Sequence, residues 1–263
     1  MDVRAYAKIN LGLRVTAKRA DGYHDIETIF QTISLHDTLT FMPSSALTLT
    51  CDAPDIPVDD TNLVLRAARA AGAPPVAIAL RKRIPAGGGL GGGSSDAAAT
   101  LRALDCADAE AALALGSDVP FFLLGGTAYA TGRGEVLTPL PSLEGIPLLL
   151  VFPPERIATA RAYAMLRRFS PPLGLARVRA MADDDLLAHA AELINDFEEP
   201  VFDAMPHLAA IKTRLYERGA AWAGMSGSGS TMVGAFRDAR ERDAALPDFT
   251  NAMAAETTAA APG

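Results

Sequence analysis

Cysteine and cationic residues are scarce in this chain of 263 residues, and long apolar runs are missing. Cys51 and Cys106 are the two cysteines, and neither has a partner at the spacing of a zinc site or a disulfide framework. The formal net charge of −7 argues against a surface that coats nucleic acid. No stretch approaches the ~18 consecutive apolar residues of a membrane span, and the N-terminus lacks the pattern of a signal peptide. We therefore expect a cytoplasmic protein that binds neither nucleic acid nor a membrane.

Glycine, in contrast, is concentrated in residues 85–95, which read PAGGGLGGGSS. Glycine has no side chain and adopts positive φ readily, so successive backbone N–H groups can turn toward one point. The alanine-rich segment that starts at Asp96 is typical of a helix and would add its unpaired N-terminal amides. Lys82 and Arg83 stand just before the run. This combination predicts an anion site, and a nucleotide polyphosphate is the anion that suits it.

Other known uses of a glycine-rich run fit this one poorly. Gly87, Gly89 and Gly92 match the dinucleotide-binding pattern, but no second strand with a ribose-binding acid follows. A Walker A loop requires lysine where Ser94 stands, and the catalytic loop of protein kinases is missing downstream. A flexible linker is a poor fit because a strand-like segment and a helix bound the run. A phosphate loop outside these classes remains.

Polar side chains near the N-terminus are candidates for the same site. The odd positions of residues 3–16 are apolar, which predicts a strand with one buried face. Lys8 and Asn10 share its other face. Tyr23 and His24 leave an Asp-Gly turn, where a ligand-binding role and a structural role are about equally open.

Asp118 is a candidate with two possible roles. It directly precedes Val119-Pro120, the position typical of a helix N-cap, and a catalytic role does not exclude capping. A second small-residue stretch, Ser226 to Ser230, is predicted to pack against a bound ligand. The tail from Asn251 onward is rich in alanine and threonine, and we expect it to be frayed.

The chain as a whole predicts an α+β fold in two domains, residues 1–145 and 146–263. Sheet dominates the first third, and a buried strand at 147–151 opens the second domain. The remaining expected elements are helices at about 62–71, 95–104, 108–115, 159–169, 175–191, 195–204 and 206–218, strands at 76–80 and 231–236, and a hairpin at 127–140.

Separated motifs together resemble the kinases named for galactose, homoserine, mevalonate and phosphomevalonate, the GHMP kinases. They are Ala7–Leu11 with Arg19–His24, Pro85–Ser95, Leu115–Pro120 and Ser226–Gly229. Within that superfamily, the Asp-Gly-Tyr-His turn and the doubled triple glycine resemble the branch that phosphorylates a cytidylyl methylerythritol in the non-mevalonate isoprenoid route. The alternative inside the superfamily is a kinase of the mevalonate or homoserine type. An oxidoreductase or a nucleic-acid module fits the charge and motifs less well.

The resemblance implies a ribosomal-protein-S5-domain-2-like N-terminal domain, a ferredoxin-like C-terminal domain, and a cleft between them. It implies ATP as donor with Mg²⁺, and a monomer or homodimer. It makes Lys8 and Asp118 the catalytic pair. The implied ATP-binding residues are Pro85, Ala86, Gly87, Gly88, Gly89, Leu90, Gly91, Gly92, Gly93, Ser94 and Ser95, and the implied substrate-binding residues are Asn10, Tyr23, His24, Lys82 and Tyr163.

In that scheme Asp118 takes the proton of the attacking hydroxyl, and His24 and Tyr163 sandwich the cytosine. The metal ligands stay unknown, with the Ser95 hydroxyl as one candidate. Asp96 departs from the asparagine that is common at this position in the family. Its extra negative charge near the phosphates is expected to weaken ATP binding.

Overall fold

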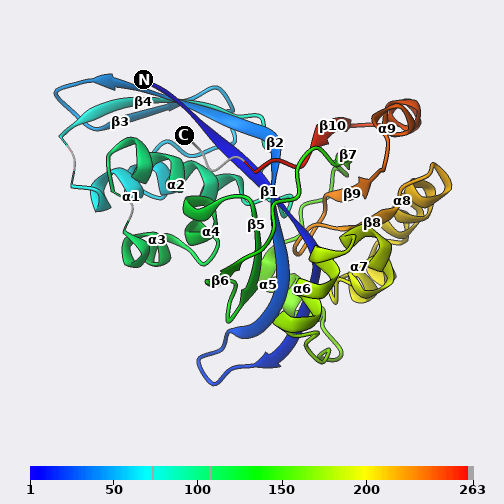
Figure 1. The fold of residues 1–263 in the computed structure, drawn as a ribbon. Helices are drawn as coiled ribbons and strands as arrows, with labels where there is room; N and C mark the ends of the chain where they lie inside the picture. Colours follow the sequence, from blue (N-terminus) through cyan, green and yellow to red (C-terminus); the bar gives the residue numbers. More distant parts are fainter. Residues whose placement is uncertain (73, 107, 260–263) are drawn as a thin grey trace.

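The computed structural model describes residues 1–72, 74–106 and 108–259, and within these residues the strands form two sheets (Figure 1). The first sheet has the order β3-β4-β2-β5-β6, with β1 paired to β2 beside this path. The second has the order β10-β7-β9-β8. The strands are β1 (Asp2–Lys18), β2 (His24–Pro43), β3 (Thr48–Cys51), β4 (Val76–Arg81), β5 (Thr127–Thr131), β6 (Val136–Pro139), β7 (Pro147–Val151), β8 (Trp222–Met225), β9 (Met232–Ala235) and β10 (Ala252–Glu256).

The antiparallel pair β1–β2 is the longest feature of the fold and reaches from the first sheet to the second (Figure 1). The strand predicted over residues 3–16 is confirmed, with its odd, apolar side chains buried. Register shifts between Tyr6 and Lys8 and between Asn10 and Leu13 interrupt the pairing. Such bulges re-aim side chains. Lys8 and Asn10 are consequently buried as well, rather than lying on a solvated face.

Helices cover the first sheet close to the glycine run. They are α1 (Leu63–Ala70), α2 (Gly92–Ala103), α3 (Ala109–Leu115) and α4 (Val119–Leu124). Helix α2 begins three residues earlier than predicted, because the Ser95 amide already donates to the carbonyl of Gly91. Ala97, Ala98 and Ala99 are fully buried, so the small side chains bring the helix backbone close to the sheet.

The second half is richer in helices, and its elements depart more from the predictions. They are α5 (Thr159–Met165), α6 (Leu175–Asp183), the 3₁₀ segment η1 (Leu186–Glu192), α7 (Glu198–Ala204), α8 (Pro206–Glu217), α9 (Ala239–Ala245) and η2 (Leu246–Asp248). The helix expected over 175–191 is wrong as one unit. It breaks after Asp183, and the Asp185 carboxylate accepts a hydrogen bond from the Leu187 amide, which caps a new segment.

The expectation of a frayed tail is also wrong. Residues 252–256 form β10, which pairs with β7, and the Thr258 amide donates to the carbonyl of Thr32. Residues 260–263 lie outside the described residues. Backbone pairing with β7 and side-chain hydrogen bonds order the segment: the Thr257 hydroxyl accepts from the Ile146 amide, and the Ser34 hydroxyl accepts from the Glu256 amide.

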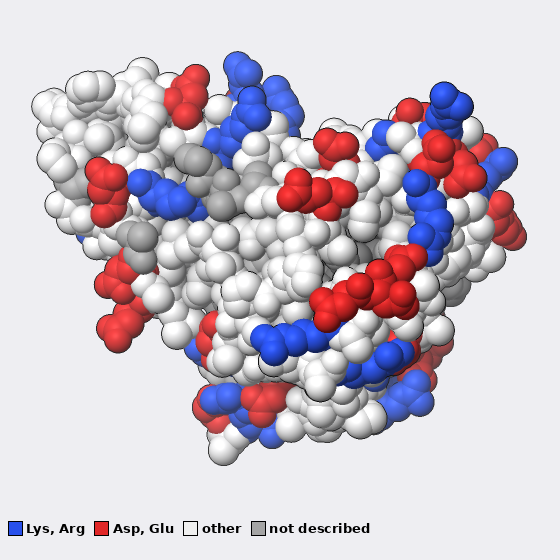
Figure 2. Space-filling view, in the orientation of Figure 1, with Lys and Arg blue, Asp and Glu red and all other residues white. Residues whose placement is uncertain are grey.

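The two halves share a core and a polar tie. One buried cluster contains Ile9 and Ile33 of the β1–β2 pair together with Leu150 and Trp222 of the second sheet. The buried Glu27 carboxylate accepts from the Leu173 and Gly174 amides, both at 2.8 Å. No helix in the described part of the chain is long and apolar enough to cross a membrane. Figure 2 shows cationic and anionic side chains interspersed over one face.

Candidate active site

A cavity of about 1300 Å³ lies between the two halves. Its lining brings together the glycine run, the turn at residues 22–24, helix α5 and the stretch Gly227–Ser228. Lys8, Asn10 and Asp118 line it as well. The cavity therefore collects, from segments far apart in the sequence, most of the residues that the motifs single out.

Parts of the glycine run, residues 85–95, are packed against their surroundings so closely that a side chain is excluded. A Cβ at Gly89 would lie 2.0 Å from the carbonyl oxygen of Ser226, and one at Gly91 would lie 2.6 Å from the Phe122 ring. Both glycines have positive φ. The Ser226 hydroxyl donates to the carbonyl of Gly89 at 2.9 Å. The stretch Ser226–Ser230, for which the sequence predicts packing on a ligand, thus supports the loop.

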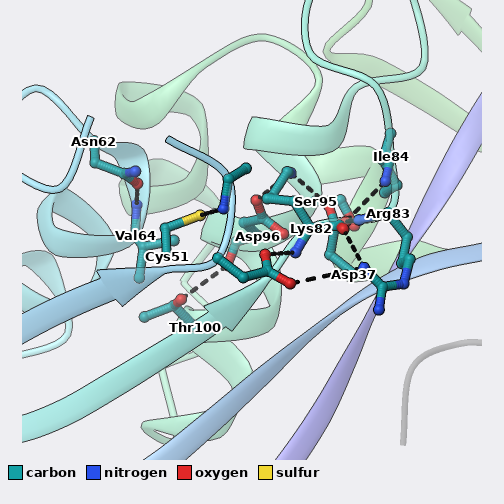
Figure 3. A network of polar contacts seen from close by, with 12 residues as sticks. Asp37, Cys51, Asn62, Val64, Lys82, Arg83, Ile84, Ser95, Asp96 and Thr100 are labelled. Carbon is teal, nitrogen blue, oxygen red and sulfur yellow. Dashed lines mark hydrogen bonds and ion pairs between the residues drawn. The ribbon is translucent and has the colours of Figure 1, made fainter. Parts of the chain in front are cut away.

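Lys82 lies beneath this run in a buried polar network, which Figure 3 shows from close by. Its ammonium donates to Oδ2 of Asp37 and, at 2.8 Å, to Oδ2 of Asp96. Burial lowers the pKa of Lys82, but Asp96 and Asp37 outweigh that effect and raise it. Burial raises the pKa of Asp96 to about 8, with Lys82 opposing the shift and Asp37 adding to it. One ammonium therefore serves two buried carboxyl groups.

Lys8 and Asp118 face each other in the lining of the cavity. The Lys8 ammonium lies 3.9 Å from Oδ2 of Asp118, donates to Oδ1 of Asn10 at 2.6 Å, and stands 5.1 Å from the centroid of the Phe30 ring. Burial lowers the pKa of Lys8, and the Asp118 charge opposes this. Asp118 occupies the N-cap position of α4, but its side chain makes no capping hydrogen bond. The capping role is therefore wrong, and the carboxylate is free for chemistry.

His24 and Tyr163 stack directly on each other, with ring centroids 4.5 Å apart and planes 16° from parallel. A base held between the two rings would need them roughly 7 Å apart, so one ring has to move for such a sandwich to form. The Phe197 ring supports Tyr163 edge-on at 4.9 Å. Burial and the nearby Lys18 charge lower the pKa of His24, whereas burial and Asp118 raise that of Tyr163 to about 12. Both rings are thus neutral at physiological pH.

Two further residues of the cavity region carried no signal in the sequence. The guanidinium of Arg133 lies 4.7 Å from the centroid of the Tyr23 ring, which is 53% exposed. Asn195 is buried, and its amide donates to the carbonyls of Met225 and Gly227 at 2.7 and 2.8 Å. Asn195 therefore fixes the stretch that supports the glycine run. Arg133 lies in a Gly-Arg-Gly tip and Asn195 between helices, contexts that do not distinguish them from surface residues.

The described residues contain no group of three or more histidine, cysteine or acidic side chains that could hold a metal ion. The Ser95 hydroxyl, the candidate from the sequence, donates to the carbonyl of Tyr6 at 2.6 Å and is buried. The described part of the chain thus offers no protein cage for Mg²⁺.

Comparison with known proteins agrees with this arrangement. The model of the GHMP kinase N-terminal domain matches residues 62–126, and that of the C-terminal domain matches residues 178–255. A solved mevalonate kinase from Methanococcus jannaschii has a TM-score of 0.71 at 14% identity, over 98% of both chains, and shows likeness of fold alone. The chain has the α+β, two-domain fold of the GHMP kinases.

Full-length relatives narrow the class. The 4-diphosphocytidyl-2-C-methyl-D-erythritol kinase of Chlorobium phaeobacteroides strain BS1 is 44% identical over 95% of this chain and 93% of its own. That of Solibacter usitatus is 46% identical over 90% and 81%. A crystal structure of a 4-(cytidine 5'-diphospho)-2C-methyl-D-erythritol kinase has a TM-score of 0.83 at 37% identity, over 99% and 100%. The chain belongs to the family of 4-diphosphocytidyl-2-C-methyl-D-erythritol kinases.

Proposed function

We propose that this chain transfers the γ-phosphoryl group of ATP to the 2-hydroxyl of 4-diphosphocytidyl-2-C-methyl-D-erythritol, a step of the non-mevalonate route to isopentenyl diphosphate. Family membership supports the reaction and ATP as its donor. The observation that carries the proposal in the structure is the Lys8–Asp118 pair, 3.9 Å apart in a cavity that the glycine run and the stacked His24 and Tyr163 rings also line.

Asp118 is the proposed base. Its carboxylate accepts the proton of the 2-hydroxyl as that oxygen forms a bond to the γ-phosphorus and the bond from phosphorus to the departing ADP oxygen breaks. Lys8 holds the carboxylate in place and stabilises negative charge on the attacking oxygen. Asn10 keeps the ammonium oriented through its 2.6 Å hydrogen bond.

The glycine run and the N-terminus of α2 are the proposed donor site. The twelve-residue helix begins at Gly92, and Gly92 and Gly93 line the cavity. The unpaired amides and the dipole at this N-terminus favour negative charge. Mg²⁺ supplies charge neutralisation on the phosphates when it is bound with ATP. Since the described residues form no cage for the ion, we assign it no protein ligand and no step.

His24 and Tyr163 are the proposed clamp for the cytosine, and Tyr23 is a further contact for the same substrate. All three line the cavity. The neutral rings offer flat apolar faces to a flat base. The resemblance also implies that Lys82 meets the substrates. Lys82 lines the cavity, but its ammonium already donates to Asp37 and Asp96.

A turnover assay tests the proposal. Purified protein with ATP and Mg²⁺ receives the cytidylyl methylerythritol, mevalonate or homoserine in parallel, and ADP release is followed. We expect ADP release with the cytidylyl alcohol, and phosphorus NMR of the product should place the new phosphate on the 2-hydroxyl. Phosphorylation of mevalonate or homoserine in its place would reject the substrate assignment.

Three coarser features belong to the same proposal. Residues 1–145 would carry the ATP-binding half and residues 146–263 the second domain. A monomer or homodimer is proposed, and sedimentation of the protein distinguishes the two. A cytoplasmic location follows from the need for ATP and is testable by fractionation of cells.

A further inference from the structure

The glycine run has its two flanks joined by a buried ion pair. Lys82 precedes the run and Asp96 follows it, and the ammonium donates to the carboxyl at 2.8 Å. Their side chains are 8% and 4% exposed. Because the residues between them carry six glycines, the free loop has an unusually large number of backbone conformations to lose. A bond across its ends removes many of them.

Asp37 of β2 anchors this pair to the sheet. Its Oδ2 accepts from the Lys82 ammonium, and its Oδ1 accepts from the backbone amides of Arg83 and Ile84 (Figure 3). The Asp37 side chain is fully buried. A single carboxylate thus fixes three successive residues that lead into the glycine run. Asp37 does not itself line the cavity, so it can act on the glycine run only through the residues that it holds.

The far side of the pair is held just as firmly. The Asp96 carbonyl accepts from the Thr100 hydroxyl within α2, and Oδ1 of Asp96 is buried without a hydrogen-bond partner among the described residues. Leaving a buried oxygen unpaired costs free energy. Buried ion pairs in general add little net stability compared with apolar packing. The cluster is therefore poorly explained as a device for stability alone, whereas control of geometry accounts for it.

We infer that Asp37, Lys82 and Asp96 form a clasp that holds the glycine run in its phosphate-binding shape before ATP arrives. In this clasp Lys82 and Asp96 close the loop and Asp37 fixes the closed loop to β2. The three are positioning residues. The inference rests on the proposed function for the identity of the anion, but not for the behaviour of the loop in the free protein.

The rival account is that the Lys82 ammonium binds the phosphates directly. The two accounts predict different changes in KM for ATP in Asp96→Ala. If Lys82 acts directly, removing a competing carboxylate frees the ammonium for ATP, and KM for ATP falls or stays the same. If the clasp acts, the loop loosens and KM for ATP rises, by about tenfold for the loss of one charge-assisted hydrogen bond.

The experiment measures Asp96→Ala and Asp96→Asn beside the wild type. For Asp96→Ala we expect faster amide hydrogen exchange in residues 85–91 of the nucleotide-free protein, a tenfold higher KM for ATP, and a KM for the cytidylyl alcohol within twofold of wild type. Asp96→Asn keeps an oxygen that accepts from Lys82. It should restore slow exchange and a KM for ATP within twofold.

Asp243→Ala is the matched control, because it removes an exposed carboxylate that pairs with Arg242, by the same substitution and far from the run. It should change neither the amide exchange of residues 85–91 nor the KM for ATP. Unchanged exchange in Asp96→Ala would overturn the clasp. A lower KM for ATP in Asp96→Asn would overturn it as well, even if Asp96→Ala fails to fold. Absence of turnover with the cytidylyl alcohol in the wild type would instead reject the proposed function, while the exchange data still test the clasp.

Discussion

The donor and acceptor sides of the cavity are built by different means. On the donor side the glycine run offers backbone amides to the ligand. Close contacts at Gly89 and Gly91 and the buried hydrogen bond of Lys82 hold the run in place. On the acceptor side the rings of His24 and Tyr163 present side chains from two separate segments, and they lie against each other. The first is a fixed surface, and the second has to open.

This difference follows from what each side binds. A phosphate chain is recognised by several amides at once, and small errors in their direction lose most of the charge stabilisation. A base is recognised by the flat faces of rings, which tolerate a range of offsets. We therefore expect substitutions on the donor side to affect folding and ATP together, and those on the acceptor side to affect one Michaelis constant.

The junction between the two sides should show the largest effect. Asp118→Asn removes the proposed base while keeping the size of the side chain, and we expect kcat to fall by roughly 10²- to 10⁴-fold. ATP affinity should change little, because the carboxylate is not part of the glycine run. Steady-state kinetics and titration with a fluorescent ATP analogue measure the two quantities. Turnover close to wild type in a folded variant would remove Asp118 from catalysis.

Within the donor side, two neighbouring glycines sharpen the comparison. A Cβ at Gly89 would meet the Ser226 carbonyl at 2.0 Å, whereas one at Gly87 meets only the end of the Arg156 side chain at 3.9 Å. Both have positive φ, which costs alanine roughly 1–2 kcal/mol. Gly89→Ala should therefore lower the free energy of unfolding by on the order of 3 kcal/mol or more, since backbone must also shift.

Gly87→Ala serves as the control for backbone strain. It should lower the free energy of unfolding only by the contribution of the positive φ angle. Urea denaturation of both variants, with ATP affinity measured on each, makes the comparison. Equal losses for the two would mean that the packing of Ser226 against the run is loose, and the view of a fixed donor surface would fail.

The sequence predicts local elements well and long-range ones less well. The alternation over residues 3–16 and the apolar run at 147–151 predict strands that the structure contains, and the helix expected at 108–115 is found as α3, which Asp108 caps. Strand β10 was missed because its side chains show no alternation, and its order comes from the edge of β7. Glycine disfavours helix, so the sequence predicts that α2 begins after the glycines. The helix in fact begins at Gly92, because packing on the sheet overrides that preference.

The site shows the same limit. The motifs single out Lys8, Asp118 and the glycine run by spacing, but Asp37 has no motif and becomes visible only when residues 82 and 96 are folded against it. Its burial could not be foreseen, since an aspartate in a strand normally faces water. The direct contact between His24 and Tyr163 likewise depends on two segments that lie far apart in the sequence.

The acceptor clamp should give an effect of intermediate size. His24→Ala and Tyr163→Ala each remove one ring face, and we expect KM for the cytidylyl alcohol to rise about tenfold, with KM for ATP unchanged. Tyr163→Phe keeps the ring and should stay within about threefold of wild type. Initial rates with each substrate varied in turn measure both constants. An unchanged KM for the cytidylyl alcohol in both alanine variants would rule out the clamp.

The smallest expected effect is the pH response of His24, which separates the mobile side from the fixed one. Burial lowers the pKa of His24 below its ordinary value of 6.5, and the Lys18 charge lowers it further. Below pH 6.5 the unfolded chain thus binds more protons at this position than the folded chain, and stability falls as the pH falls.

His24→Gln removes this pH-dependent loss of stability. The variant should gain on the order of 1 °C in Tm relative to wild type between pH 8 and pH 5.5, because solvent screens a partly exposed ring. Calorimetry at the two pH values measures the difference. A relative decrease in the Tm of the variant would mean that the folded protein stabilises a charged His24. The closed stack of neutral rings would then be wrong.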